Sequence, residues 1–185
     1  MEVRLLSRKE VESLQIPVTE VMDVVEKGFA LKGKDAMEMP AKIGIHPRKD
    51  CFIHAIPCYV GGAADVAGIK WVSGYPLNQP KGLPYITGVM CLNDPETGFV
   101  KVIMDANWIT AWRTGAATGV CARHMADPDS RVLAVIGLGV QGRTNAAALA
   151  AALPKVEKVK VYDKHAEQVP RFLELVKEDL KGIEV

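Results

Sequence analysis

The chain has 185 residues, of which 49% are apolar, and its 23 basic and 22 acidic side chains leave a formal net charge of +1. This composition predicts a globular protein and argues against nucleic acid as a partner, because no concentrated basic surface is encoded. The N-terminus is charged within its first four residues, and no apolar run is long enough for a secretory signal or a membrane span. We therefore expect a cytoplasmic protein with no membrane partner.

The N-terminal part of the sequence predicts two helices followed by a sheet. Ser7 and Glu10 have the spacing of a capping box, which favours a short opening helix. A longer helix is expected from Pro17 to Gly33, because proline suits a first turn and apolar residues recur on one face. From Met39 the pattern changes to β-rich runs that we interpret as one sheet. These runs are 41–46, 51–59, 65–73, 85–93 and 99–104.

A hairpin and a further helix are predicted next. Pro95 and Gly98 lie where a tight turn between the last two β-rich runs needs them. Asp105 is expected to cap a helix over 106–125. Small residues on that helix predict a face against which another backbone packs closely; they are Ala111, Gly115, Ala116 and Gly119.

The polar, turn-rich segment 126–130 is the best candidate for a domain boundary. We therefore divide the chain into a first domain, 1–126, and a second domain, 127–185. The second domain alternates strand, helix, strand and helix and ends in the start of a third strand; the segments are 131–136, 140–153, 158–163, 166–180 and 182–185. This alternation predicts a parallel α/β sheet.

A glycine-rich loop follows the first strand of the second domain. Gly137, Gly139 and Gly142 form G-x-G-x-x-G between a strand and a helix, and Asp163 lies 21 residues after Gly142, at the end of the next strand. This context predicts a dinucleotide site, with the phosphates at the helix N-terminus and the ribose on Asp163. An incidental glycine turn is the alternative. The carboxylate favours NAD over NADP because it repels a 2′-phosphate, although Lys164 and His165, directly after it, could soften that repulsion.

Three cations are candidates for binding a substrate carboxylate. Lys42, Lys70 and Arg113 each lie in an apolar or glycine-rich setting, where an unpaired charge is costly. The alternatives are a solvated side chain and a structural ion pair.

The first domain also contains residues with some likeness to a zinc site, namely His46, Cys51, His54 and Cys58. If the last three lie on one strand, alternation places Cys51 on the face opposite His54 and Cys58. We therefore expect no metal site.

Four motifs carry a resemblance to a known family. In chain order they are "MPAKIGIHP", "GIKWVSGYPLNQPKGLPYITGVMCLNDPETG", "TAWRTGAATG" and "VIGLGVQGRTN". Over essentially its whole length the chain resembles the ornithine cyclodeaminase/mu-crystallin family, whose enzymes use NAD and act on the Cα–N bond of small amino acids or their imines. The resemblance implies an α+β substrate-binding and dimerisation domain, 1–126, followed by the first half of a Rossmann-type NAD-binding domain, 127–185.

The resemblance also implies roles for individual residues. Lys42, Lys70 and Arg113 would surround the substrate carboxylate, and Arg113 would also lie near the phosphates on the nicotinamide side. Cofactor contacts would fall on Val140, Gln141 and Asp163.

Two positions depart from the family pattern. His54 stands where some cyclodeaminases have a glutamate, and Tyr85 stands where a threonine contributes near the cofactor. A neutral imidazole cannot hold a cationic amine as a carboxylate does, so ornithine as the substrate is in doubt. A structural histidine in the core is the other interpretation of His54. We expect a small amino acid or imine as substrate, without naming which.

The family's acid/base aspartate would lie beyond Val185, and the second domain supplies two strands and the start of a third, where a full dinucleotide fold has six. We therefore expect a chain truncated on its C-terminal side, inactive in isolation, whose missing half is either cut away or a separate chain. The resemblance implies a homodimer. A non-catalytic protein that binds NAD(P)H or a small ligand, like mu-crystallin, is the alternative function.

Overall fold

The computed structural model describes residues 2–185, and its backbone packs into two compact units. The first unit contains residues 2–15 with Gly28–Ile109, and the second contains Ile16–Lys27 with Thr110–Val185. These limits differ from the division at residue 126, because helices α2 (Val18–Gly33) and α3 (Asn107–Met125) each contribute residues to both units. The functional assignment of the two predicted domains stays a prediction.

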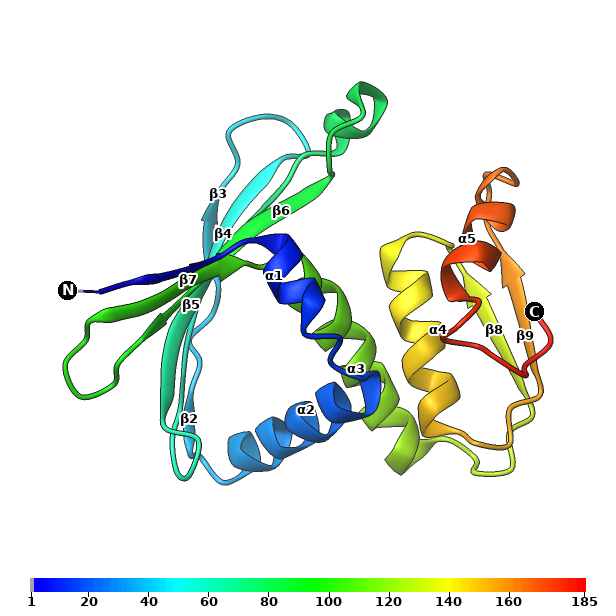
Figure 1. The fold of residues 1–185 in the computed structure, drawn as a ribbon, viewed down its shortest axis with the longest axis horizontal. Coiled ribbons are helices and arrows are strands. Elements are labelled where there is room, and N and C mark those ends of the chain that lie inside the picture. The colour runs from blue at the N-terminus through cyan, green and yellow to red at the C-terminus, as the bar shows by residue number, and fades with distance from the viewer. Residues whose placement is uncertain (1) are drawn as a thin grey trace. The chain divides into compact units, whose positions relative to one another are not determined.

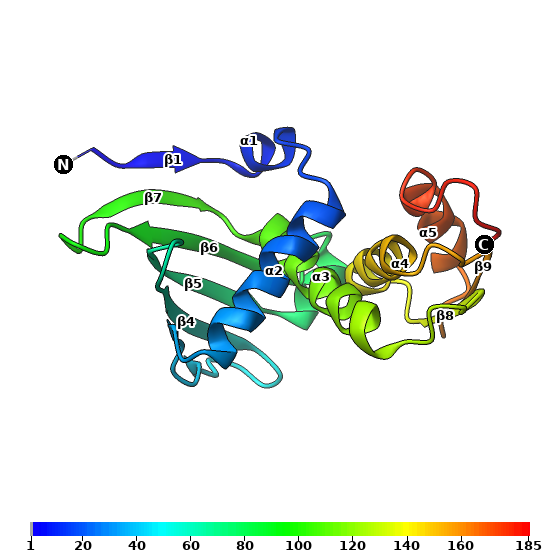
Figure 2. The same cartoon turned by 90° about the horizontal axis from the view of Figure 1, so that it is seen from below.

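The first unit is built on a seven-stranded sheet, which confirms the predicted single sheet. Its strands are β1 (Arg4–Leu6), β2 (Met37–Glu38), β3 (Ile43–Ile45), β4 (Phe52–Val60), β5 (Val66–Gly74), β6 (Ile86–Asn93) and β7 (Val100–Asp105). They follow the order β1-β7-β6-β5-β4-β2, with β3 also paired to β4, and Figure 2 shows β4 to β7 side by side. Strands β1 and β2 were not predicted, because two or three residues are too few for alternation to be visible.

The predicted local signals of the first unit are present. Helix α1 (Arg8–Ser13) begins at the capping box, in which the Ser7 amide donates to Glu10 Oε2 over 2.7 Å. The hairpin closes through Gly98, whose φ is +73° and whose amide donates to the Asp94 carbonyl over 2.8 Å. A short 3₁₀ helix, η1 (Pro76–Lys81), lies between β5 and β6 and was not predicted.

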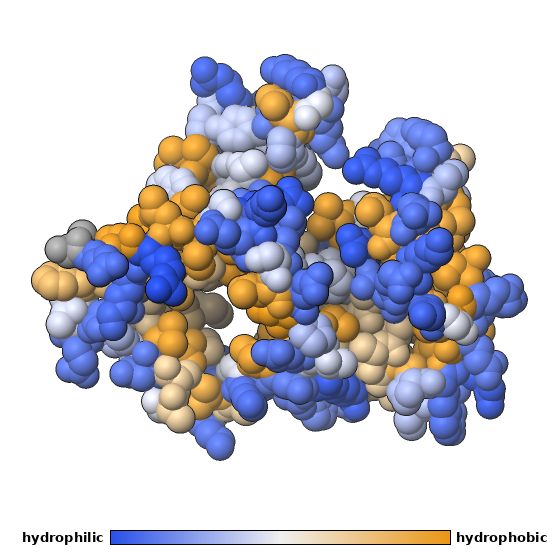
Figure 3. Space-filling view, viewed as in Figure 1, coloured by the Kyte–Doolittle hydropathy of each residue, from blue (hydrophilic) through white to orange (hydrophobic). Residues whose placement is uncertain are grey.

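The two faces of this sheet differ in burial. Ile56, Lys70 and Met90 are paired in register across β4, β5 and β6, so they share one face, which we call the lysine face. Their sequence neighbours Ala55, Trp71 and Val89 define the opposite tryptophan face. Lys70 is 9% exposed, whereas Trp71 is 49% and Val89 41% exposed. Apolar side chains of this unit reach the molecular surface (Figure 3).

The second unit has the predicted strand–helix alternation. Its elements are β8 (Val132–Ile136), α4 (Val140–Ala152), β9 (Lys158–Tyr162) and α5 (Gln168–Val176), which are labelled in Figure 1. Strands β8 and β9 are parallel, and Glu184 forms a parallel bridge with Lys158, so a third strand begins where it was predicted. Helix α5 is shorter than the predicted 166–180, because the chain continues as turns after Val176.

One face of this parallel sheet is covered and the other is not. Both helices pack against the covered face, in a buried cluster that includes Leu133, Val135, Ala146, Val159, Phe172 and Val176. The alternate residues Val132, Ile136 and Tyr162 are 52%, 83% and 63% exposed. Parallel sheets of complete α/β domains are covered on both faces. That the second unit is one part of such a domain stays a prediction.

Helix α3 packs through small residues, as predicted. It begins after Asp105, whose Oδ1 accepts the Asn107 amide over 2.8 Å. A side-chain carbon at Gly115 would collide with the Thr144 carbonyl, and one at Gly119 would lie 3.0 Å from the Ala148 carbonyl oxygen. The backbones of α3 and α4 therefore approach closely within the second unit. Among residues 2–185, no helix has both the length and the apolar character that crossing a membrane demands.

Candidate functional site

The glycine loop joins β8 to α4 in a conformation that only glycine tolerates at two of its positions. Gly137 has a φ of +92°, in the left-handed region, and its amide donates to the Tyr162 carbonyl over 2.8 Å. A side-chain carbon at Gly142 would collide with the carbonyl oxygen of Gly137. At Gly139 the same carbon would meet no atom within 4 Å, so this glycine faces open space.

The start of α4 has no side-chain cap beside that open space. Gly139 is its N-cap residue and makes no side-chain capping bond, so the first N–H groups of the helix lack the partner that a serine or aspartate would provide. Val140 and Gln141 lie in this first turn and are exposed. An uncapped helix N-terminus with close backbone access fits a diphosphate.

Asp163 lies directly after β9 and faces the loop. Its Oδ2 accepts the Leu138 amide over 2.8 Å, and its Oδ1 accepts the His165 amide over 2.9 Å. These two hydrogen bonds, first that of Leu138, hold the pKa of the Asp163 carboxyl below its ordinary value. The side chain is therefore an anion at neutral pH, beside the loop where the sequence places the adenosine ribose.

Two residues of this region were missed by sequence reasoning. Leu138 is 5% exposed and anchors the loop in the core of the second unit, so the residue between the first two glycines has a structural role. Arg143 donates from Nε and Nη2 to Asp179 Oδ2, each over 3.2 Å, and its guanidinium lies 5.7 Å from the centre of the Trp112 ring. Sequence reasoning could have found Arg143 from its position directly after the last glycine of the loop.

The predicted carboxylate-binding cations belong to different units. Lys70 lies in the middle of β5 on the lysine face, 9% exposed. Lys42 directly precedes β3, where register continued from the Ile43–Ala55 pair would set it opposite Ile56, the partner of Lys70. Arg113 lies on α3 in the second unit, where partial desolvation lowers the pKa of its guanidinium. Extension of the β3 register would place both lysines on one face, and the convergence of the three cations stays a prediction.

His54 lies on the lysine face of β4, opposite Gly44 and Val72. Burial, followed by the charges of Lys42 and His46, lowers the pKa of its imidazole. Tyr85 directly precedes β6 and is 41% exposed; its carbonyl accepts the Tyr75 amide over 2.8 Å, and its predicted cofactor role stays a prediction.

Among residues 2–185, no three His, Cys, Asp or Glu side chains converge to hold a metal ion. Cys51 is buried, and Cys58 donates a long hydrogen bond of 3.8 Å to the Tyr59 carbonyl.

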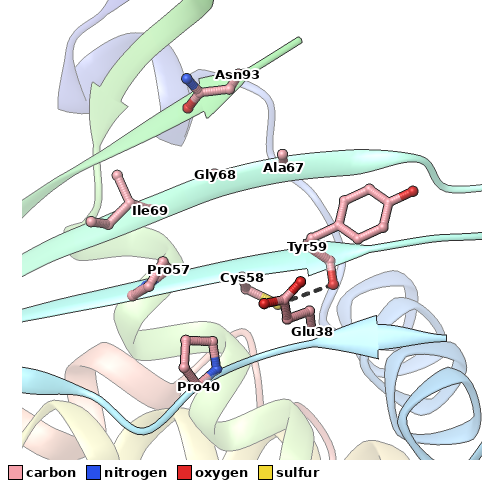
Figure 4. A pocket seen from close by; sticks show the side chains of 9 residues that line it. All are labelled: Glu38, Pro40, Pro57, Cys58, Tyr59, Ala67, Gly68, Ile69 and Asn93. Carbon is pink, nitrogen blue, oxygen red and sulfur yellow. Dashed lines mark hydrogen bonds between the residues drawn. The ribbon is translucent and has the colours of Figure 1, made fainter. Parts of the chain in front are cut away.

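A shallow depression at one end of the β4–β5 pair is a poor carboxylate site. It has a volume of about 440 Å³ and is lined by Glu38, Pro40, Pro57, Cys58, Tyr59, Ala67, Gly68, Ile69 and Asn93. Figure 4 shows Glu38 as the one formally charged side chain among them. A carboxylate ligand would meet repulsion there and no cation, so this depression is not the predicted site.

Comparison with known proteins matches residues 1–185 to the "Ornithine cyclodeaminase/mu-crystallin family". Nodulation efficiency protein NfeD of Rhizobium meliloti is 41% identical over 155 residues, which are 84% of this chain and 48% of that protein.

Two solved structures resemble the chain closely. The Δ1-pyrroline-2-carboxylate reductase of Thermococcus litoralis, in complex with NADH and L-proline, has a TM-score of 0.91 and 37% identity, and the match covers 98% of this chain and 55% of that one. An archaeal alanine dehydrogenase dimer with bound NAD has a TM-score of 0.89 and 36% identity, with coverage of 100% and 55%. The chain thus spans about half the length of these relatives.

Two alanine substitutions separate the structural role of the glycine loop from its predicted role in binding. We expect Gly142→Ala to lower the free energy of unfolding by about 1–3 kcal/mol, because its methyl group collides with a backbone carbonyl. The free energy of unfolding of Gly139→Ala should lie within about 1 kcal/mol of that of the unmodified chain. This variant should nevertheless bind NADH more weakly, because its methyl group fills the open space beside the loop. Urea unfolding and NADH fluorescence titration measure the two effects. Equal stability of both variants would contradict this account of the loop.

Proposed function

Because the chain belongs to the ornithine cyclodeaminase/mu-crystallin family, we propose that it forms part of an NAD-dependent enzyme acting on the Cα–N bond of a small amino acid or its imine. The observation that carries the proposal is the glycine loop, with its uncapped helix and the Asp163 anion beside it. The relatives named for NADH with L-proline and for NAD support the same chemistry. We place the activity in the cytoplasm, where the free cysteines Cys51, Cys58, Cys91 and Cys121 would stay reduced.

The second unit would hold the cofactor by its backbone and one carboxylate. The first amides of α4 would donate to the diphosphate, and Gly139 leaves the space for it. Asp163 would accept hydrogen bonds from the ribose hydroxyls and repel a 2′-phosphate, which favours NAD over NADP. When bound, the nicotinamide dinucleotide supplies a hydride acceptor or donor.

The cations would hold and orient the substrate. Lys42 and Lys70 on the lysine face, together with Arg113, would neutralise the α-carboxylate and fix the position of Cα. Fixing Cα restricts the orientations in which hydride can leave or reach it, which is how positioning contributes to the rate. Oxidation of an amine removes a hydride from Cα and a proton from nitrogen. We propose no residue of this chain as the base that accepts the proton.

The tryptophan face supports a homodimer as part of the proposal. Leu5, Ile43 and Ile45 extend the exposed apolar surface around Trp71 and are 69%, 71% and 60% exposed. Among the described residues, both clusters of buried apolar side chains lie in the second unit, so the sheet of the first unit lacks one of its own. A sheet gains stability by burying an apolar face, and a second copy would bury this one.

The catalytic proposal predicts a change in nicotinamide absorbance. In a protein that carries this chain at the length of its relatives, at least one small amino acid or imine should change the absorbance of NAD or NADH. Lys70→Met should lower kcat/KM for that substrate by about 100-fold, because a charge-assisted contact to the carboxylate is lost, while NADH binding stays unchanged. The exposed Lys9→Met serves as the control. Absence of turnover with every substrate would instead support a binding protein.

The cofactor proposal predicts a shift in nucleotide preference. Asp163→Asn retains an oxygen that can accept the Leu138 amide but removes the charge, so NADPH should bind about tenfold more tightly relative to NADH than in the unmodified chain. Asp129→Asn, in the exposed turn before β8, should leave the ratio unchanged. Fluorescence titration with both nucleotides measures the ratio. An unchanged ratio in Asp163→Asn would contradict the role of the carboxylate.

The dimer proposal predicts that a charge on the tryptophan face separates the subunits. Trp71→Glu should give a monomer at micromolar concentration, because an unpaired carboxylate would be buried in the interface. Met125→Glu, at an 84% exposed position outside the sheet, should remain a dimer. Sedimentation velocity distinguishes the two states. A dimeric Trp71→Glu variant would place the interface elsewhere.

A further inference from the structure

The depression at the end of the β4–β5 pair lies on the tryptophan face. Four of its lining residues are paired in register across β2, β4, β5 and β6, namely Glu38, Tyr59, Ala67 and Asn93. Ala67 lies four residues before Trp71 on β5, so strand alternation gives the two side chains the same face. The depression therefore borders the surface that we propose to meet a second copy, and it lies on the face opposite Lys70.

The walls of the depression are apolar and held in place. The Tyr59 hydroxyl donates to Asp65 Oδ1 over 3.0 Å, and a side-chain carbon at Gly61 would lie 3.4 Å from the Tyr59 ring, so this ring packs beside the glycine. Pro40 and Pro57 add walls whose backbone φ is fixed by the proline ring. The volume of about 440 Å³ lies within the range of small-molecule sites. The depression is thus a preformed apolar surface of ligand size.

The side-chain polar groups that remain available in the depression are acceptors. Among residues 2–185, the exposed Glu38 carboxylate has no hydrogen-bonding or ion-pair partner, and Figure 4 shows it projecting from β2 toward β4. Asn93 Nδ2 already donates to the Gly98 carbonyl over 2.9 Å, which leaves its Oδ1 to accept. The Cys58 thiol donates to the Tyr59 carbonyl over 3.8 Å. A ligand that fits these groups must therefore bring donors.

The charges around the depression are mainly negative. The hydrogen bond to Asp65, the charge of that residue, burial and the charge of Glu96 all raise the pKa of the Tyr59 phenol. Glu38 adds a third carboxylate on the lining itself. Lys32 is the cation that acts on Cys58, where it opposes the rise in the pKa of the thiol that burial causes. Three carboxylates against one ammonium group favour a cationic ligand.

We propose that this depression binds a small organic ammonium ion with an apolar body, its ammonium group on Glu38 and its body against Tyr59 and Pro57. The carboxylate supplies a charge-assisted hydrogen bond, and the tyrosine ring attracts a cation that lies against its face. An amino acid fits less well, because its carboxylate would meet no cation on the lining. The site is therefore distinct from the proposed amino-acid site, and it does not depend on the proposed function.

Phenethylammonium and L-phenylalanine test the inference, because they share a ring and an ammonium group and differ by the carboxylate. In a ¹H–¹⁵N NMR titration of the 185-residue chain, millimolar phenethylammonium should shift the amide signals of Tyr59 and Asn93. L-Phenylalanine should bind at these amides at least about fivefold more weakly. The uncharged 2-phenylethanol should also bind about fivefold more weakly, because it lacks the contact between the ammonium group and the carboxylate.

Two substitutions locate the site. Glu38→Gln keeps the shape of an exposed side chain on a short strand and removes its charge, so phenethylammonium should bind about fivefold more weakly. Glu174→Gln, at an exposed position on α5, is the matched control and should leave the affinity unchanged. Ala67→Leu should abolish binding, because the larger side chain fills the depression. The NMR spectrum of each variant shows whether it is folded.

Three results would overturn the inference and leave the proposed function standing. They are the absence of phenethylammonium binding, equal binding of L-phenylalanine at the Tyr59 and Asn93 amides, and an unchanged affinity in folded Glu38→Gln and Ala67→Leu. Tighter binding of N-acetyl-L-lysine N-methylamide than of phenethylammonium would assign the depression to a lysine side chain of a partner protein, and would overturn the small-molecule ligand as well.

Discussion

The contact between Gly142 and the carbonyl of Gly137 is the constraint on which the second unit depends. It lets the first turn of α4 lie against the end of β8 with no side chain between them. The amides of that turn, which no side chain caps, then lie at the carboxyl end of the strands, where open α/β sheets bind ligands. Asp163 reinforces the arrangement by accepting the Leu138 amide. The proposed cofactor site is thus made largely of backbone, and the carboxylate proposed to bind the ribose also holds the loop.

The two faces of the sheet in the first unit carry different kinds of side chain. The lysine face carries Lys70 and His54, at positions where burial makes charge and hydrogen bonding count. The tryptophan face presents Trp71 and Val89 to the surface. The lysine face therefore suits a small polar ligand. The tryptophan face suits the surface of another protein. Both proposals for this unit follow from a single alternation along β5.

The sequence predicted those features that short patterns encode. The Ser7–Glu10 capping box, the Gly98 turn and the glycine loop each depend on residues close together in the chain, and the structure contains all three. Strands β1 and β2 were missed because their stability comes from pairing with distant segments and not from their own residues.

Packing across strands also could not be predicted from the sequence. Nothing near His54 in the chain indicates that Gly44 lies beneath its ring, or that His46 meets it edge to face. That packing arises from the register of β3 on β4, which is a long-range property. The three cations proposed to bind a carboxylate show the same limit. Their apolar or glycine-rich settings in the sequence singled out Lys42 and Lys70, but the face on which Lys70 lies became visible only through strand pairing.

The register of the sheet is itself specified by glycines. All four glycines within its strands, Gly44, Gly68, Gly74 and Gly88, lie on the lysine face. Each is paired with a larger residue, for instance Gly44 with His54 and Gly74 with Phe52, whose rings occupy the space that a side chain would need. A slip of one residue would set these rings against side chains and would exchange Lys70 with Trp71. The glycines that make room for the His54 and Phe52 rings therefore also fix which face carries the lysine.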